Sequence, residues 1–113
     1  MRAYFIIRKD LNLSPAKLAV QVGHGVCLMY NNIGLVEPIK RWNANNMKKI
    51  VVKIDNEDKM NNIWNKLLDD KYFSEKIYDL GLTELNGFTH TGIVLLVSEN
   101  DIPNYVKRLR LYE

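Results

Sequence analysis

Lys17, Gln21 and His24 are the polar residues whose types and spacing are best suited to chemistry, since they are four and three residues apart in an otherwise apolar segment. On an α-helix this spacing brings the three side chains to one face. Lys17 follows Ser14-Pro15, a typical helix start, and the free N–H groups of a helix N-terminus favour anions. The three side chains could therefore hold a phosphate and place an imidazole beside it for proton transfer. The alternative is that they form the solvent-facing side of the helix.

A second concentration of polar residues runs from Asp79 to Thr91 and contains two glycines and several hydroxyl groups. A carboxylate at a strand end followed by such a stretch suits a binding loop, because loops held by a rigid sheet are where functional sites gather. Asp-x-Gly is also ordinary turn chemistry. Both interpretations stay open at the level of the sequence.

Cys27, three residues from His24, could pair with it as nucleophile and base. In a nearly all-apolar helix we expect instead a buried, inert thiol. The histidines, Cys27 and Asp79 match no recognised spacing of metal ligands, so no metal site is expected.

Two tryptophans and two basic clusters are further candidates for contact with a nucleic acid. Trp42, in an irregular region, could stack on nucleic-acid bases, whereas Trp64 is expected in the core. Lys48-Lys49 and Lys107–Arg110 are either solvated or in contact with phosphates. The net charge of +3 permits a polyanionic partner without demanding one.

The elements that must position these groups belong to one domain of 113 residues. With 47% apolar and 26% charged residues, the composition excludes a disordered or collagen-like chain. No apolar run is long enough to span a membrane, and the N-terminal segment is interpreted as a strand rather than a signal peptide. A single cysteine cannot form an internal disulfide, which favours a reducing, cytoplasmic location.

Strand-like and helix-like segments alternate, which predicts an α/β fold. Strands are expected at Tyr4–Ile7, Lys49–Ile54, Lys76–Tyr78 and Thr91–Val97; helices are expected at Pro15–Tyr30, after Asn56 and at Pro103–Leu109, with a short helix starting at Pro38 and a loop at Asn43–Asn46. Helical crossovers imply parallel pairing for part of the sheet, and the short last connection leaves room for antiparallel pairing.

The two longer helices have different patterns. Apolar residues surround the first, so we expect it to be covered on most sides. Its Gly23 and Gly25 each cost up to about 1 kcal/mol relative to alanine, which the close approach of a backbone or ligand would offset. The helix after Asn56 carries one apolar stripe, formed by Met60, Ile63, Trp64, Leu67 and Leu68.

Taken together, the two polar regions resemble the peptidyl-tRNA hydrolases of the archaeal and eukaryotic type. In that family Arg-x-Asp-Leu follows a strand and precedes a helix with Gly-Lys-x-Ala-x-Gln-x-x-His-Ala; the matching residues here are Arg8–Leu11 and Ala16–Gly25. The family's second block is Asp-Ala-Gly-Arg-Thr, then Gly-Thr-x-Thr and a hydrophobic strand; it matches Asp79–Thr83 and Gly87–Val97. The order of elements agrees over nearly the whole chain.

The chain departs from the family pattern at several positions. Leu82 replaces an arginine and Glu84 a glutamine, so the charge near the expected tRNA site is less positive. Gly25 replaces alanine, Ser14-Pro15 replaces a glycine-rich basic run, and Gly87 comes one residue early.

The resemblance implies a single three-layer α/β domain over residues 1–113, with a four-stranded mixed β-sheet between helices. It implies hydrolysis of the ester that joins a peptide to the terminal ribose of tRNA, without metal or cofactor. The implied site consists of Lys17, His24, Asp79, Thr83 and Thr91, with Arg8, Lys17 and Gln21 in contact with the tRNA. Asp79 or His24 would orient the water, Lys17 would stabilise charge or contact a phosphate, and the threonine hydroxyls would position the reactants.

Two other functions remain open on the sequence alone. One is a non-catalytic RNA- or protein-binding module on the same fold, which Leu82 and Glu84 favour. The other is an esterase or amidase for a small ligand. A homodimer could form through an apolar face on the first or last helix. Ester cleavage requires that the start of the first helix and Asp79 share one open cleft.

Overall fold

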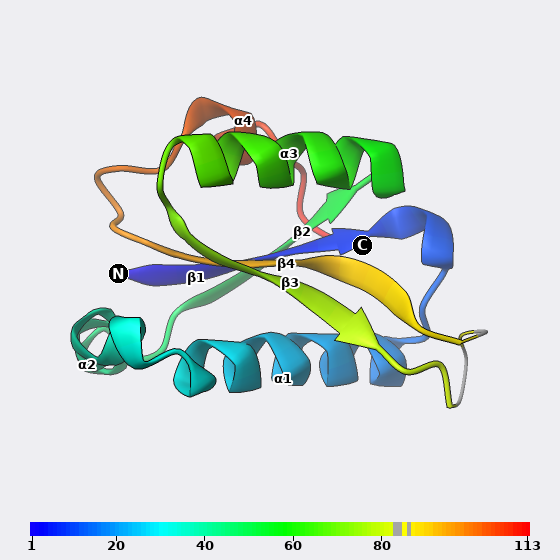
Figure 1. Ribbon diagram of the computed structural model, residues 1–113, viewed down its shortest axis with the longest axis horizontal. Helices are drawn as coiled ribbons and strands as arrows, with labels where there is room; N and C mark the ends of the chain where they lie inside the picture. The colour runs from blue at the N-terminus through cyan, green and yellow to red at the C-terminus, as the bar shows by residue number, and fades with distance from the viewer. Residues whose placement is uncertain (83–84, 86) are drawn as a thin grey trace.

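The computed structural model describes residues 1–82, 85 and 87–113, apart from the side chain of Ile33. The strands are β1 (Arg2–Arg8), β2 (Lys49–Ile54), β3 (Phe73–Asp79) and β4 (Thr89–Val97), and the helices are α1 (Pro15–Asn31), α2 (Val36–Ala44), α3 (Glu57–Asp69) and α4 (Asn104–Lys107). This confirms the predicted alternation of strands and helices (Figure 1).

The described strands form one mixed sheet in the order β2-β1-β4-β3. β1 and β2 are parallel, and β4 is antiparallel to both β1 and β3. β3 therefore runs in the same direction as β1 and β2. As a result the carboxyl ends of these strands, at Arg8, Ile54 and Asp79, lie at one end of the sheet, where α1 also begins (Figure 1).

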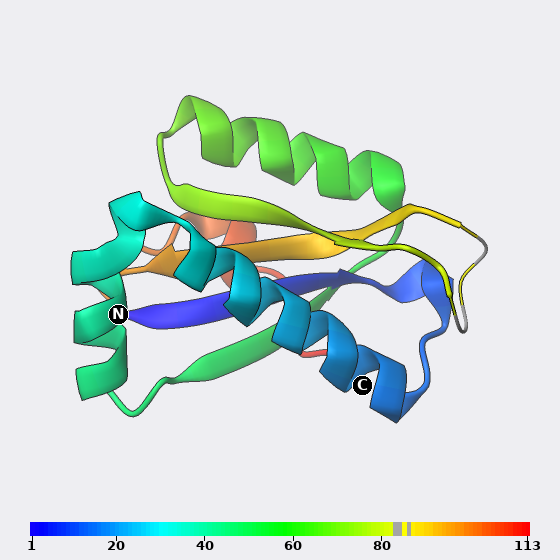
Figure 2. The same ribbon diagram turned by 60° about the horizontal axis from the view of Figure 1, so that its bottom comes forward.

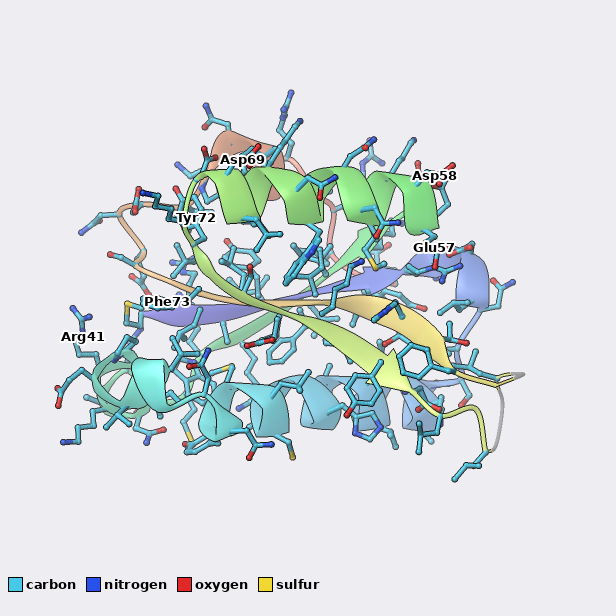
Figure 3. All side chains as sticks on the ribbon, in the orientation of Figure 1. Arg41, Glu57, Asp58, Asp69, Tyr72 and Phe73 are labelled. Atoms are coloured by element: carbon cyan, nitrogen blue, oxygen red, sulfur yellow. The ribbon has the colours of Figure 1, made fainter. Side chains whose placement is uncertain are left out.

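Helices cover both faces of the sheet, so the three-layer prediction is confirmed. α1 and α2 lie on one face, and α3 and α4 on the other (Figures 1 and 2). A hydrophobic core lies on each face of the sheet, and β1 contributes to both. Phe5 and Ile7 pack toward α1, while Tyr4 and Ile6 pack toward α3. This double burial is why β1 is a continuous apolar run. Charged side chains such as Arg41 and Asp69 project from the outer helix surfaces (Figure 3).

The prediction that α1 is covered on most sides is wrong. Its buried residues follow a four-residue spacing, Lys17, Gln21, Gly25 and Met29, whereas Val20 and Tyr30 on other faces are exposed. Only the sheet side of this outer-layer helix is covered, and the apolar residues elsewhere on α1 face solvent or its neighbours in the same layer.

One of the two α1 glycines is explained by a close contact. A Cβ atom at Gly25 would lie 2.9 Å from Cε1 of Phe5 and 3.1 Å from Cδ1 of Ile77. The expected close approach is therefore confirmed at this position, with side chains rather than a backbone as neighbours. At Gly23 a Cβ atom would meet nothing within 4 Å, so the same expectation is wrong there.

The region between α1 and β2 is more ordered than predicted. α2 begins at Val36, before Pro38, and ends at Ala44 instead of giving way to a loop at Asn43. Proline is tolerated there because the N–H groups of a first turn have no helical acceptor. Trp42 is buried in the α1-side core, and its Nε1 donates to the carbonyl of Lys48 at 2.9 Å. The interpretation of Trp42 as a base-stacking residue is therefore wrong.

The remaining predicted bounds differ by a few residues. β2 agrees with its prediction, and Asn56 caps α3 by accepting from the N–H of Lys59 at 3.0 Å. Leu68, assigned to the apolar stripe of α3, is half exposed. β3 is longer than predicted, because its polar residues Ser74 and Glu75 gave no apolar run at the edge of the sheet.

Candidate active site

The site begins with the start of α1. Ser14 is the N-cap residue, and its hydroxyl accepts from the N–H of Lys17 at 3.1 Å, as the sequence predicted. Pro15 occupies the first position of the helix. These two residues place Lys17 in the first turn, on the side of α1 that faces the sheet.

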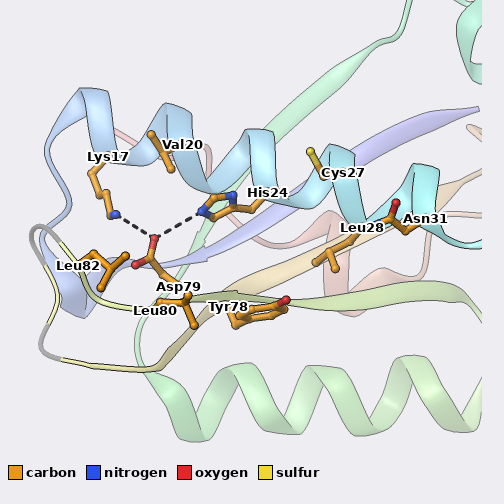
Figure 4. A pocket seen from close by; sticks show the side chains of 10 residues that line it. All are labelled: Lys17, Val20, His24, Cys27, Leu28, Asn31, Tyr78, Asp79, Leu80 and Leu82. Carbon is orange, nitrogen blue, oxygen red and sulfur yellow. Dashed lines mark ion pairs between the residues drawn. The ribbon is translucent and has the colours of Figure 1, made fainter.

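Lys17 meets Asp79, the last residue of β3. Its Nζ lies 2.9 Å from Oδ2 of Asp79, and Nε2 of His24 lies 3.5 Å from the same oxygen. Gln21 donates its Nε2–H to Oδ2 at 2.7 Å, and the N–H of Gly81 donates to Oδ1 at 2.7 Å. Figure 4 shows Lys17 and His24 converging on the carboxylate from α1. Asp79 is thus the point at which the two polar regions of the sequence meet.

Asp79 is buried, which raises its pKa. The hydrogen bonds from Lys17, Gly81 and Gln21 outweigh this burial and hold the pKa of the carboxyl well below its usual range. Asp79 is therefore ionised at neutral pH. A carboxylate of this kind is a weak proton acceptor and a strong electrostatic anchor.

Behind Asp79 lies a buried hydrogen-bonded chain. The hydroxyl of Thr91, on β4, donates to Oε1 of Gln21 at 2.7 Å, and the amide of Gln21 donates to Asp79. Gln21 and Thr91 are both 0% exposed. The chain fixes the orientation of the Gln21 amide and, through it, of the carboxylate.

In front of Asp79 lies an open pocket of about 440 Å³ between α1 and the end of β3. The polar residues Lys17, His24 and Asp79 line it, together with apolar side chains that include Val20, Leu28, Leu80 and Leu82 (Figure 4). Its volume lies within the usual range for small-molecule sites. A charged cluster with apolar walls can bind and orient a ligand that carries both kinds of surface.

The structure brings Lys17, His24 and Asp79 into one pocket, as ester cleavage requires. Because Lys17 and Gln21 are buried, the alternative of a solvent-facing stripe is wrong. Gln21 and Thr91 lie behind the pocket, where their hydrogen bonds hold Asp79 in position. Thr83 lies outside the described residues.

Arg8 lies away from the pocket. Its guanidinium forms ion pairs with Asp10 at 2.8 Å and Glu57 at 3.5 Å. It also donates to the carbonyl of His90, at the start of β4, at 3.0 Å. Arg8 therefore joins the ends of β1, β4 and α3, and two acidic side chains balance its charge.

The prediction that Cys27 is buried is wrong. The thiol is exposed and lines the pocket beside Leu28. Sequence reasoning also missed Tyr78, which lines the pocket next to Asp79. Strict alternation along a strand would put Tyr78 and Asp79 on opposite faces, yet both line the pocket at the carboxyl end of the edge strand β3. The signal in the sequence was only an aromatic residue next to a candidate carboxylate.

Two further properties concern the described residues alone. No three or more histidine, cysteine, aspartate or glutamate side chains among them lie close enough together to hold a metal ion. None of the helices they form has the length and apolar character needed to cross a membrane.

A polar cluster in an open pocket at the carboxyl end of the strands of an α/β sheet defines the protein as an enzyme-like α/β domain. Residues 1–112 match the family described as peptidyl-tRNA hydrolase PTH2. The chain belongs to this family.

Curated relatives from archaea carry the name peptidyl-tRNA hydrolase. The protein of Thermococcus onnurineus is 38% identical over 89 residues, covering 71% of this chain and 70% of the relative. The protein of Haloquadratum walsbyi is 29% identical over 113 residues, covering 99% and 100%. The protein of Methanocaldococcus jannaschii is 28% identical over 97 residues, covering 84% of both chains.

Proposed function

We propose that this protein hydrolyses the ester bond of peptidyl-tRNA and releases the peptide and free tRNA. Membership of the PTH2 family over residues 1–112 carries the proposal. The site supports it, because Lys17, His24 and Asp79 line one open pocket. Ester hydrolysis needs a group that takes a proton from water and a donor for the oxyanion, and the imidazole and the ammonium can supply these.

In this proposal His24 is the general base. Imidazole is the side chain best suited to proton transfer near neutral pH. As the water oxygen attacks the ester carbonyl carbon, its proton passes to the imidazole. Asp79, 3.5 Å from Nε2, stabilises the imidazolium that forms. The bond between the carbonyl carbon and the ribose oxygen then breaks, and the imidazolium protonates the departing oxygen.

Lys17 stabilises the negative charge that develops on the carbonyl oxygen. Asp79 holds the ammonium at 2.9 Å, and Lys17 lines the pocket. A cation fixed in advance by an ion pair does not have to reorganise during the reaction, which is the basis of electrostatic catalysis. The resemblance also implied that Lys17 contacts a phosphate, and this role stays a prediction.

Gln21 and Thr91 act as positioning residues in this proposal. Both are fully buried, so they act through Asp79 rather than on the substrate. The positioning hydroxyl implied for Thr83 stays a prediction.

The tRNA backbone is proposed to cross the end of the sheet toward a basic cluster. Lys53, Lys59, Arg108 and Arg110 surround a second hollow beside the end of β2, with Asp55 among them. Because β2 and β3 end on the same side of the sheet and are separated by two strands, their ends are about 15 Å apart. Phosphates of the strand that carries the ester can bridge this distance, and lysine and arginine are the residues that bind them.

The test is release of peptide from peptidyl-tRNA by Asp79→Asn and His24→Ala proteins, with Asp69→Asn as the control. Asp69 is an exposed aspartate at the end of α3. We expect kcat/KM to fall at least about 100-fold in the two site variants and to stay near the wild-type value in the control. Wild-type rates in both site variants would eliminate the assignment.

The proposal also includes the oligomeric state and the location of the protein in the cell. A homodimer and a cytoplasmic location remain predictions from the sequence. Sedimentation equilibrium at micromolar concentration decides the first, since a mass near twice 13.2 kDa would indicate a dimer. Fractionation of the source cells decides the second.

A further inference from the structure

We propose that the terminal adenine of the tRNA stacks on the ring of Tyr78, beside Asp79, and that Phe88 extends this aromatic surface. The inference rests on the proposed function, which supplies an ester attached to the terminal ribose. It goes beyond that function by assigning a binding site to the base of the nucleotide that carries the ester.

Two aromatic rings, one near the end of β3 and one just before the start of β4, are open to solvent. Tyr78 is 43% exposed and Phe88 is 60% exposed. Their ring centroids are 5.4 Å apart and their planes differ by 21°, so the two rings are stacked. The edge of this pair meets the ring of His90, 5.1 Å from Phe88 at 88°. Exposed apolar surface gathered in one place indicates a binding site rather than part of the core.

Tyr78 also belongs to the pocket that holds the polar cluster. It comes directly before Asp79 and lines the same pocket as Val20 and Leu28 of α1. In Figure 4 the ring lies along β3 next to Asp79, with Leu28 on the α1 side of the pocket. Flat bases bind between aromatic rings and apolar side chains, where both of their faces are covered.

The chemistry of the substrate restricts where the base can lie. The ester and the adenine are attached to the same ribose ring, so they are separated by only a few covalent bonds. If Lys17 and His24 hold the ester, the base must enter the part of the pocket adjacent to them. Among the described residues that line this pocket, Tyr78 carries the one phenyl-type ring.

The polar groups of the pocket favour stacking as the way to bind this nucleotide. Among the described residues that line it, Lys17 is the only lysine or arginine, and Asp79 balances its charge at 2.9 Å. The exposed side chains of Leu80 and Leu82 add apolar surface at the rim. Every tRNA ends in the same adenosine, whereas the last amino acid of the peptide varies. A shaped aromatic surface is therefore better matched to the base than to the amino-acid side chain.

The test uses a mimic that the protein does not cleave as an ester, 3′-amino-3′-deoxyadenosine with an N-acetylaminoacyl group in amide linkage at the 3′ nitrogen. A second compound has the same ribose and acyl group but no base. Binding is measured by calorimetry, or as competitive inhibition of peptidyl-tRNA cleavage. For the wild-type protein we expect the adenine compound to bind at least about tenfold more tightly than the abasic one, as stacking energies of single bases indicate.

The variants locate this preference in the structure. In Tyr78→Ala the ratio of the two dissociation constants should fall to near one, whereas Tyr78→Trp should retain it. Phe88→Ala should reduce the ratio about threefold. Phe73→Ala is the matched control, because Phe73 is 47% exposed on the same strand and does not line the pocket. It should leave the ratio unchanged.

Two results would overturn the proposal. One is equal binding of the adenine and abasic compounds by the wild-type protein, a result that needs no variant to fold. The other is affinity that follows the acyl side chain, with leucine far above glycine, and is insensitive to the base. The latter would assign the apolar wall to the last amino acid of the peptide. Failure of the proposed function is a separate observation, namely no release of peptide from peptidyl-tRNA by the wild-type protein.

Discussion

Asp79 connects the groups of the site more directly than any other described residue. Its two oxygens receive Lys17, Gln21 and the N–H of Gly81 within 2.7–2.9 Å. These contacts lower its pKa, so the carboxylate holds its neighbours in place and, in the proposed mechanism, leaves proton transfer to His24. Of the two bases that the sequence left open, we therefore propose the imidazole.

The depressed pKa of Asp79 has a consequence for stability. In the unfolded chain this carboxyl takes up a proton near pH 4, while in the folded protein it stays ionised. The unfolded state therefore binds more protons, and the free energy of unfolding falls as the pH drops below about 5. We expect wild type to lose about 1–2 kcal/mol more than Asp79→Asn between pH 6 and pH 3. Urea unfolding at several pH values measures this difference, and parallel profiles would contradict it.

The buried chain behind Asp79 predicts coupled variants. Thr91→Val removes a hydroxyl from Oε1 of Gln21, and Gln21→Met removes the donor to Asp79. Each should destabilise the protein by about 1–3 kcal/mol, because a buried polar partner loses its hydrogen bond. Each should also lower kcat more than it changes KM. In the double variant the two losses should fall short of their sum, since both act on one chain; simple additivity would show that the chain does not act as a unit.

At the scale of elements, α1 is the helix that carries the site, and two features determine its placement. Ser14 caps the start of the helix, which makes Lys17 a first-turn residue. Gly25 lets the helix approach β1, where Phe5 fills the space that a methyl group would occupy. The sheet face of α1 therefore lies close enough for Gln21 to reach Asp79.

The two glycines of α1 form a matched pair for testing this placement. Gly25→Ala should lower the free energy of unfolding by about 1–2 kcal/mol, because the contact at 2.9 Å outweighs the gain in helix propensity. Gly23→Ala, with nothing within 4 Å, should raise it by about 0.5–1 kcal/mol. Thermal and urea unfolding measure both changes. A stabilised Gly25→Ala protein would show that α1 is not held at this distance.

Most elements could be predicted from local patterns, and the exceptions have physical causes. The N-cap and proline before Lys17, and the β-branched run at Lys49–Ile54, gave bounds that agree with the structure to within a residue. The helix expected from Pro38 begins two residues earlier, at Val36, because proline fits within a first turn. The strand expected at Lys76–Tyr78 begins earlier, at Phe73, because the polar residues at its start on an edge strand give no apolar run.

At the scale of the whole molecule, the mixed sheet places the pocket and the basic hollow at the same end. β1, β2 and β3 all end there, with the pocket at β3 and the basic hollow at β2. α2 lies at the opposite end of the sheet (Figure 1). The net charge of +3 is small, so the distribution of charge matters more than its total for binding a polyanion.

This distribution predicts how tRNA binding responds to salt. Arg110→Ala, in the basic hollow, should weaken binding and reduce the slope of log K against log salt by about 1. Lys40→Ala removes an equal charge from α2, where Lys40 is exposed and paired with Glu37 at 3.3 Å, and should leave the slope unchanged. Filter binding of tRNA between 50 and 200 mM salt measures both slopes, at concentrations typical for such titrations. Equal slopes would place the backbone of the tRNA elsewhere.

The sequence by itself determined what depends on neighbours along the chain: the start of α1, the face shared by Lys17, Gln21 and His24, and the type of most elements. Helical and strand periods act over a few residues, so spacing alone carries this information. Tertiary structure decided which polar groups meet. Gln21 reaches Asp79 across 58 positions and Thr91 reaches Gln21 across 70. Contacts of this kind, like the exposure of Cys27 and the place of Tyr78, arise only when α1 packs on the sheet, because burial and partners are properties of the packed layers.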